Sequence, residues 1–167
     1  MLCPVCRHDN FEGEDTCASC GADLATSDIP QSVLEYDQTI LGDHLHNLGL
    51  SEMVVVTPDT GVAEAIRTMH DSGGDCLLVC DGDRLVGIFT DRDAVVKAAD
   101  KRLQLYTVSD FMTPDPVVLR EEDTLAVAVH KMAVGEFRHI PIVTETGSPI
   151  GVVAAADVFR HIAAALG

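Results

Sequence analysis

The segment Cys76-Leu77-Leu78-Val79-Cys80 is followed, after the turn residues Asp81-Gly82-Asp83, by Gly87-Ile88-Phe89-Thr90. Two short apolar runs joined by turn residues are typical of a buried β-hairpin. The same pattern returns later in the chain as His139-Ile140-Pro141-Ile142-Val143 and Gly151-Val152-Val153-Ala154. The chain therefore contains an internal duplication, in which segment 54–98 aligns with segment 117–162.

Each repeat also contains two predicted helices. The first helix carries apolar residues at the spacing i, i+3, i+4, i+7, which indicates an amphipathic helix. These residues are Val62, Ala65, Ile66 and Met69 in the first repeat, and Leu125, Ala128, Val129 and Met132 in the second. A second helix is expected over 93–99 and over 157–165, and short strands are expected over 54–56 and 117–119. Because one such β-α-β-β-α unit has little core of its own, we expect the two units to stack sheet to sheet and share a core.

The duplicated segments resemble the cystathionine-β-synthase (CBS) domain family in the tandem arrangement called a Bateman module. The matching stretches are 57–60 and 85–93 in the first repeat, and 108–113, 116–118, 137–143 and 151–153 with Asp157 in the second. The resemblance covers about two thirds of the chain. It implies an α/β fold of two CBS repeats packed as a pair, with the first repeat at 50–105 and the second at 106–167.

The resemblance further implies a regulatory module that binds AMP, ADP, ATP or another adenosine derivative between its repeats. The family signature Gly-h-x-Ser/Thr-x-x-Asp, where h is apolar, matches 87–93 in full. It implies that Asp93 holds the ribose hydroxyls and that Thr90 assists at ribose or phosphate. The same Thr-x-x-Asp pattern is close to a helix capping box, and this alternative stays open. The second repeat keeps Asp157 but has Ala154 in place of the hydroxyl, which favours a ligand role for Thr90.

Other residues are expected to complete the ligand site. Related nucleotide-binding modules have basic residues at the place of Arg138 and His139, which implies that these two reach the phosphates. A histidine satisfied by the backbone is the alternative for His139. Val117 and Val118 are also expected at the ligand, and Asp157 is a candidate ligand residue of a second, weaker pocket. A mirror-image pocket around Asp157 would face Asp75 and Cys76 and would repel phosphate.

The N-terminal residues 1–24 contain four cysteines in a pattern typical of a metal site. Cys3-Pro4-Val5-Cys6 and Cys17-Ala18-Ser19-Cys20 are two C-x2-C pairs separated by ten residues. This spacing places four thiolates around Zn²⁺. The stretch resembles the short zinc-ribbon family but has Arg7 where that family often has Gly. Disulfides, a redox pair and an iron site are the alternatives. Four thiolates would leave no open coordination position, so we expect a structural zinc ion in a module that docks a protein partner.

Composition limits the remaining function classes. The chain has 27 acidic against 11 basic residues and no basic cluster, so a nucleic-acid partner is not expected. It contains no apolar run of about 20 residues and no secretory signal, so we expect a cytoplasmic location and no membrane partner. No catalytic arrangement of side chains is evident, so an enzyme is not expected.

Two further expectations concern assembly. Residues 25–49 are expected to form a linker with short helices that include Val33 and Leu34. Amphipathic helices on both edges of each repeat suggest more apolar surface than one module covers, so we expect a homodimer. The alternative function is a ligand-independent adaptor that dimerises through its CBS pair and binds a partner through the zinc ribbon.

Overall fold

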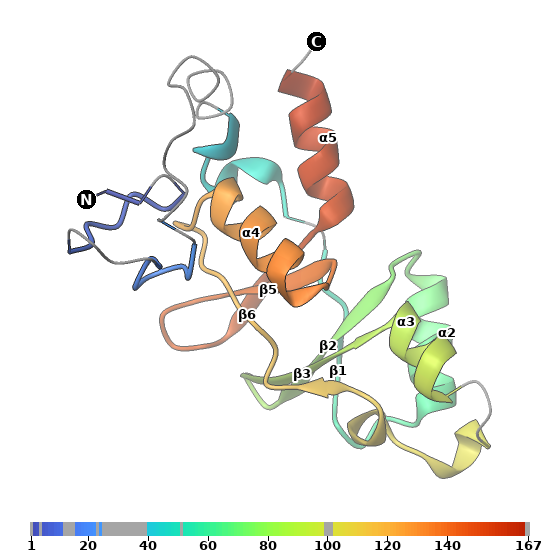
Figure 1. Cartoon of the computed structure of the whole chain (residues 1–167). Helices are drawn as coiled ribbons and strands as arrows, with labels where there is room; N and C mark the ends of the chain where they lie inside the picture. Colours follow the sequence, from blue (N-terminus) through green and yellow to red (C-terminus); the bar gives the residue numbers. More distant parts are fainter. Residues whose placement is uncertain are drawn as a thin grey trace. The chain divides into compact units, whose positions relative to one another are not determined.

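The computed structural model describes residues 2–3, 5–11, 16–22, 24, 40–50, 52–98 and 102–165 (Figure 1). The chain forms two compact units, each built from separate stretches of sequence. We call the first the ribbon unit, which comprises residues 1–50, 119–140 and 153–167. The second, the sheet unit, comprises residues 51–118 and 141–152. Neither unit coincides with one sequence repeat.

The sheet unit is built on a four-stranded sheet with the order β1-β2-β3-β4. These strands span Val55–Val56 (β1), Cys76–Asp81 (β2), Arg84–Thr90 (β3) and Thr113–Pro114 (β4). β1 runs parallel to β2, whereas β2, β3 and β4 pair antiparallel. The predicted hairpin is confirmed, and its turn includes Gly82 at a φ of 60°. A residue with a side chain rarely adopts a positive φ, which explains why glycine occupies this position.

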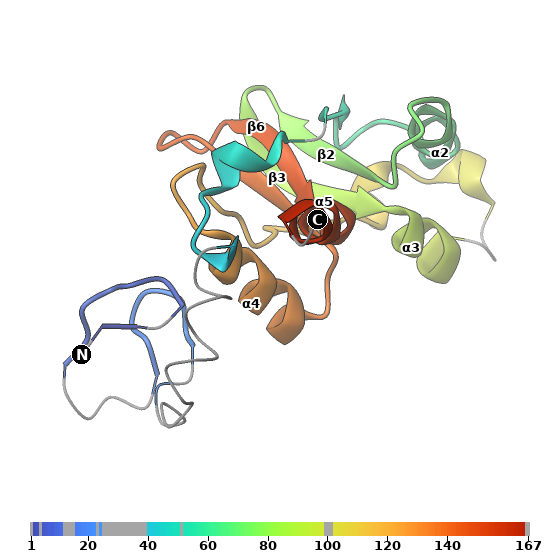
Figure 2. The ribbon, with the colours of Figure 1, turned by 90° about the horizontal axis from the view of Figure 1, so that it is seen from above.

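Helix α2 (Val62–Asp71) packs on one face of this sheet (Figures 1 and 2). The predicted apolar stripe faces the strands. The buried cluster on this side contains Val56, Val62, Ala65, Met69, Leu77, Val79, Phe89, Val108 and Phe111. Burial of these side chains fixes the position of β3 and of the turn that follows it.

The opposite face of the sheet carries a second buried cluster. It consists of Leu78, Cys80, Ile88 and Val152, with Cys76 packed against it. Val152 lies on β6 (Pro149–Ala154), which pairs with β5 (His139–Val143) in a two-stranded sheet. Strands from both repeats therefore contribute to one core, as the duplication predicted.

The ribbon unit contains the cysteine segment, the short 3-10 helix η1 (Leu45–Leu48) and helices α4 (Leu125–Gly135) and α5 (Ala155–Ala165). Figure 2 looks along α5. Leu45 is fully buried, and its N–H donates to the carbonyl oxygen of Asp123 at 2.9 Å. Nε2 of His161 on α5 lies 2.8 Å from the carboxylate of Asp43. These contacts attach the segment before the first repeat to the helices of the second.

Three elements differ from the sequence-based prediction. Residues 117–119 form no strand: Val117 and Val118 are exposed, and buried Leu119 makes a single-residue β-bridge. The second helix of the first repeat begins earlier, as a single turn α3 (Asp91–Asp93) that continues into the π-helical turn η2 (Ala94–Ala98). Likewise, α5 begins at Ala155 rather than at residue 157.

Two short 3-10 helices, η3 (Leu103–Leu105) and η4 (Val108–Asp110), lead from the first repeat into β4. The predicted linker helix around Val33 and Leu34 lies outside the described residues. Among the described residues, no helix is both long and apolar enough to cross a lipid bilayer.

Candidate functional site

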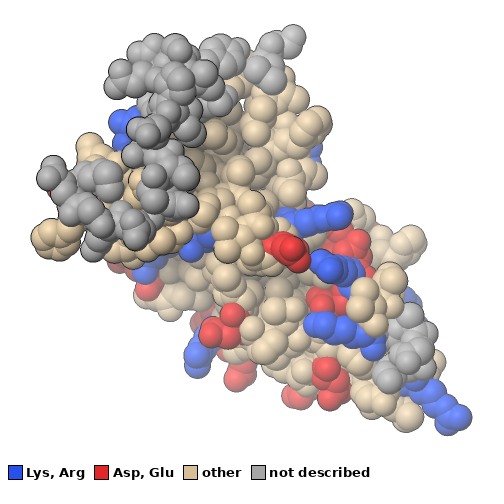
Figure 3. All heavy atoms as spheres, viewed as in Figure 1, with Lys and Arg blue, Asp and Glu red and all other residues tan. Residues whose placement is uncertain are grey.

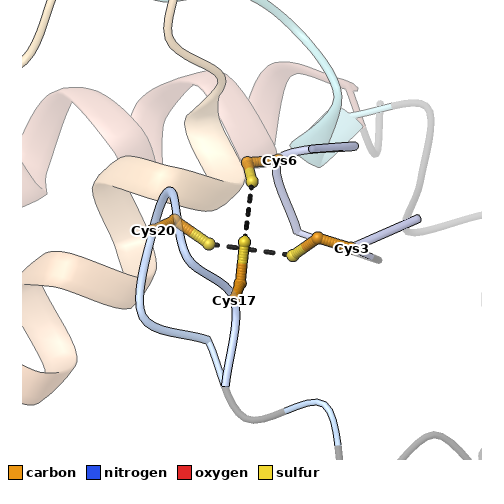
Figure 4. A group of neighbouring side chains, drawn as sticks. All are labelled: Cys3, Cys6, Cys17 and Cys20. Carbon is orange, nitrogen blue, oxygen red and sulfur yellow. Dashed lines mark hydrogen bonds between the residues drawn. The ribbon is translucent and has the colours of Figure 1, made fainter. Parts of the chain in front are cut away.

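The four N-terminal cysteines converge on one point (Figure 4). The Sγ atoms of Cys3 and Cys20 lie 3.7 Å apart, and those of Cys6 and Cys17 lie 3.5 Å apart. Four sulfurs around a tetrahedral ion at about 2.3 Å would be separated by about 3.8 Å. A disulfide would bring two sulfurs to about 2.05 Å, and all four cysteines are free. The cluster therefore fits a metal ion and not two disulfides.

The two cysteine pairs are held by the same backbone turn. The N–H of Arg7 donates to the carbonyl oxygen of Cys3 at 2.9 Å, and the N–H of Gly21 donates to that of Cys17 at 2.8 Å. Arg7 has a φ of 58° and Gly21 a φ of 71°. The first turn therefore forms without glycine, although the left-handed conformation costs a residue with a side chain about 1–2 kcal/mol.

A buried asparagine joins the two turns. Asn10 is 6% exposed, and its Nδ2 donates to the carbonyl oxygen of His8 at 2.9 Å. Its Oδ1 accepts from the N–H of Ala18 at 2.9 Å. Sequence reasoning did not single out Asn10. The sequence feature that could have identified Asn10 is an amide residue in the polar stretch between the two cysteine pairs.

The thiols of this cluster differ in acidity. Burial raises the pKa of Cys6 and of Cys20. Burial also acts to raise the pKa of Cys17, but hydrogen bonds from the backbone of Cys20 and Ser19 and from the thiols of Cys6 and Cys3 together lower that pKa to about 6. The protons of Cys6 and Cys20 are therefore the ones that a bound metal would have to displace near neutral pH.

The predicted ligand residues Thr90 and Asp93 meet at the junction of β3 and α3. The N–H and Oγ1 of Thr90 donate to Oδ2 of Asp93 at 3.0 and 2.8 Å. The N–H of Asp93 donates back to Oγ1 of Thr90 at 3.2 Å. These bonds form the helix capping box that the sequence left open as an alternative, and Asp93 is 8% exposed.

Lys97 binds the other oxygen of the Asp93 carboxylate. Its Nζ lies 2.6 Å from Oδ1 and also donates to the carbonyl oxygen of Phe111 at 3.0 Å. Sequence reasoning missed this residue, although its i, i+4 spacing from Asp93 is the signal for such a pair.

The second repeat has the same junction without the hydroxyl. Oδ2 of Asp157 accepts from the N–H of Ala154 at 3.0 Å, and Oδ1 pairs with Arg160 at 2.8 Å. Asp157 is also buried. The strand-to-helix junction therefore forms with the carboxylate alone, and the hydroxyl of Thr90 is an addition specific to the first repeat.

The remaining predicted ligand residues lie on other stretches of the chain. Val117 and Val118, in the sheet unit, are 43% and 38% exposed. Arg138 and the half-buried His139 belong to the ribbon unit, where the carbonyl oxygen of Arg138 accepts from the N–H of Ala155 at 2.8 Å. Hydrogen bonds join Thr90 to Asp93, and a common site of these two residues with Arg138 and His139 stays a prediction.

Charge is mixed on the face of the molecule shown in Figure 3, where Lys and Arg side chains lie among Asp and Glu side chains. The whole chain has a formal net charge of −16. Long-range attraction therefore cannot assist an anionic ligand, which would need donors at the site itself.

Comparison with known proteins identifies the family. The CBS domain matches residues 48–100 and 108–164, so the chain belongs to the CBS domain family. The four-cysteine cluster lies outside the matched residues.

Two curated relatives illustrate the match. The chain is 37% identical over 110 residues to inosine-5′-monophosphate dehydrogenase of Korarchaeum cryptofilum, a match that covers 66% of this chain and 22% of that enzyme. It is 34% identical over 116 residues to an uncharacterized 17.7 kDa protein of Acidianus ambivalens, covering 69% of this chain and 70% of that protein. The match covers only 22% of the dehydrogenase, so that enzyme's activity is not transferred to this chain.

Solved structures show the same fold. CBSX2 of Arabidopsis thaliana in complex with AMP is 26% identical, with a TM-score of 0.65, and the match covers 74% of this chain and 98% of that one. A CBS-domain-containing protein from Agrobacterium tumefaciens is 29% identical, with a TM-score of 0.63, and the match covers 70% and 96% of the two chains. The similarity therefore extends over nearly the whole length of both solved chains.

Proposed function

We propose that this protein is a non-catalytic regulatory module that binds an adenosine derivative such as AMP, ADP or ATP through Thr90 and Asp93. The observation that carries the proposal is the buried carboxylate and its neighbouring hydroxyl at the β3–α3 junction. A carboxylate can accept two hydrogen bonds from the vicinal hydroxyls of a ribose. The similarity to CBSX2, whose structure contains AMP, supports this ligand class.

The proposal assigns different roles to the two repeats. Thr90 and Asp93 hold the ribose, while Arg138 and His139 supply positive charge and donors at the phosphates. Val117 and Val118 provide apolar contact. The second junction lacks the hydroxyl at Ala154, so one adenine nucleotide binds per chain.

Calorimetric titration with AMP and ATP tests this assignment, with Asp157→Ala as the matched control for Asp93→Ala. Each substitution removes a buried carboxylate that accepts a backbone N–H at a strand-to-helix junction. Hydrogen bonds to a charged partner contribute about 1.5–3 kcal/mol each, so Asp93→Ala should weaken binding about tenfold or more. Asp157→Ala should leave the affinity nearly unchanged, and Arg138→Ala should weaken binding of AMP and ATP but not of adenosine. Loss of binding in Asp157→Ala alone would place the ligand in the other pocket.

We also propose that the metal of the N-terminal cluster is a structural Zn²⁺ bound by Cys3, Cys6, Cys17 and Cys20. The sulfur separations and the all-thiolate ligand set support zinc, although such ligands also suit iron. Elemental analysis of protein purified under reducing conditions decides between the metals. One zinc per chain is expected, and four freely titratable thiols without metal would contradict the proposal.

A second candidate function is a ligand-independent adaptor. Phe11 and Leu2 in the ribbon are 82% and 66% exposed, which favours a docking role for this segment.

Val134 on α4 and Phe159 on α5 are 72% and 73% exposed, which favours a homodimer through the CBS pair. Sedimentation should give a dimer. If metal-loaded protein binds no adenosine derivative, the adaptor function is preferred.

A further inference from the structure

The carboxylate of Asp93 is almost fully occupied. A carboxylate offers about four acceptor positions. Oδ2 accepts both the N–H and the hydroxyl of Thr90, at 3.0 and 2.8 Å. Oδ1 pairs with Nζ of Lys97 at 2.6 Å. One acceptor position therefore remains on Oδ1.

Two vicinal hydroxyls of a ribose need two acceptor positions on this carboxylate. We propose that Lys97 is a specificity-determining residue, whose ammonium group competes with the ribose diol for Oδ1 of Asp93. A ligand then binds through both hydroxyls only when it displaces Lys97, whereas a ligand with one hydroxyl binds beside it. This inference rests on the proposed binding of an adenosine derivative at Thr90 and Asp93.

The two partners of the pair differ in their freedom to move. The Asp93 side chain is 10% exposed and is fixed by Thr90, whereas the Lys97 side chain is 42% exposed. The carbonyl oxygen of Phe111, 3.0 Å from Nζ, remains as a second partner for the ammonium group when it leaves Asp93. An ion pair with one half-exposed member contributes little net stability, so an entering hydroxyl can replace it.

The test compares AMP with 2′-deoxy-AMP, which carry the same charge. Any change in electrostatic attraction caused by a substitution at Lys97 affects both ligands equally, and the ratio of their dissociation constants isolates the second hydroxyl. In Lys97→Met the preference for AMP over 2′-deoxy-AMP should rise about fivefold, which corresponds to about 1 kcal/mol. Lys97→Arg, which keeps a cation beside Asp93, should retain the wild-type ratio.

Arg92→Met is the matched control, because it removes a neighbouring exposed cation for which no ion pair with Asp93 is described. It should leave the ratio unchanged. Lys97→Ala is the second variant if Lys97→Met lowers the melting temperature, and it should raise the ratio equally. The inference is overturned if the preference for AMP over 2′-deoxy-AMP is unchanged or smaller in both neutral variants. An equal loss of affinity for both nucleotides is one such outcome. The proposed function would still stand in that case. If no variant binds either nucleotide, the proposed function fails and the inference fails with it.

Discussion

Arg7 and Gly21 occupy corresponding positions in the two cysteine turns, which allows the cost of backbone strain to be measured at the proposed zinc site. Both residues have positive φ, 58° and 71°. A residue with a side chain loses about 1–2 kcal/mol in this conformation. Glycine would relieve that strain, but its greater freedom in the unfolded segment offsets about 0.4–1 kcal/mol. The net gain expected for glycine is about 1 kcal/mol.

At the proposed zinc site, metal binding would supply the folding free energy of this short segment, so the strain energy should appear in the metal affinity. Arg7→Ala keeps the strain and removes the charge, so it is the reference for Arg7→Gly. Arg7→Gly should bind Zn²⁺ about fivefold more tightly than Arg7→Ala, at 1.4 kcal/mol per tenfold change. Gly21→Ala should bind about fivefold more weakly than wild type, since a Cβ there meets no atom within 4 Å and only strain changes.

Competition with a chelator of known affinity measures these differences in the full chain. Equal affinities of Arg7→Gly and Arg7→Ala would refute the argument from strain. So would a Gly21→Ala variant that binds zinc as tightly as wild type.

Two further outcomes follow from the packing and from the thiols. Gly87→Ala should destabilise the sheet unit by about 1–3 kcal/mol, because the new Cβ would lie 2.5 Å from Sδ of Met112 and 3.2 Å from the carbonyl oxygen of Thr113. Thermal unfolding measures this loss of stability, and an unchanged melting temperature would contradict it. Metal binding near pH 7 should release the protons of Cys6 and Cys20, whose pKa values are raised above the ordinary thiol value. Apparent affinity should therefore increase with pH, and the binding enthalpy should vary with the ionisation enthalpy of the buffer; an enthalpy independent of buffer would count against these protonation states.

Local patterns were sufficient to predict most elements of the fold. The apolar spacing identified α2 and α4, and the duplicated hairpins identified β2, β3, β5 and β6, because each pattern reflects the period of one element. The strand predicted over 117–119 was wrong. Apolar β-branched residues fit a strand, but strand formation also needs a partner for the backbone, and of these residues Leu119 alone is bridged.

The candidate sites divide in the same way. The spacing of the four cysteines by itself predicted that their thiols converge, since side chains in two short turns are positioned by nearby residues. The signature at Thr90 and Asp93 predicted both a capping box and a ligand site, and only the structure showed that the capping bonds are made.

The contacts that join distant stretches were decided by the tertiary structure. Lys97 on Asp93, Asn10 between the cysteine turns, and Val152 in a cluster with Leu78 all depend on where the chain places each side chain in space. A sequence pattern records the period of a helix or strand and the residue types of a turn. It does not record which side chains from distant stretches pack against one another. Those contacts depend on the free energy of the whole core and of its buried polar groups together.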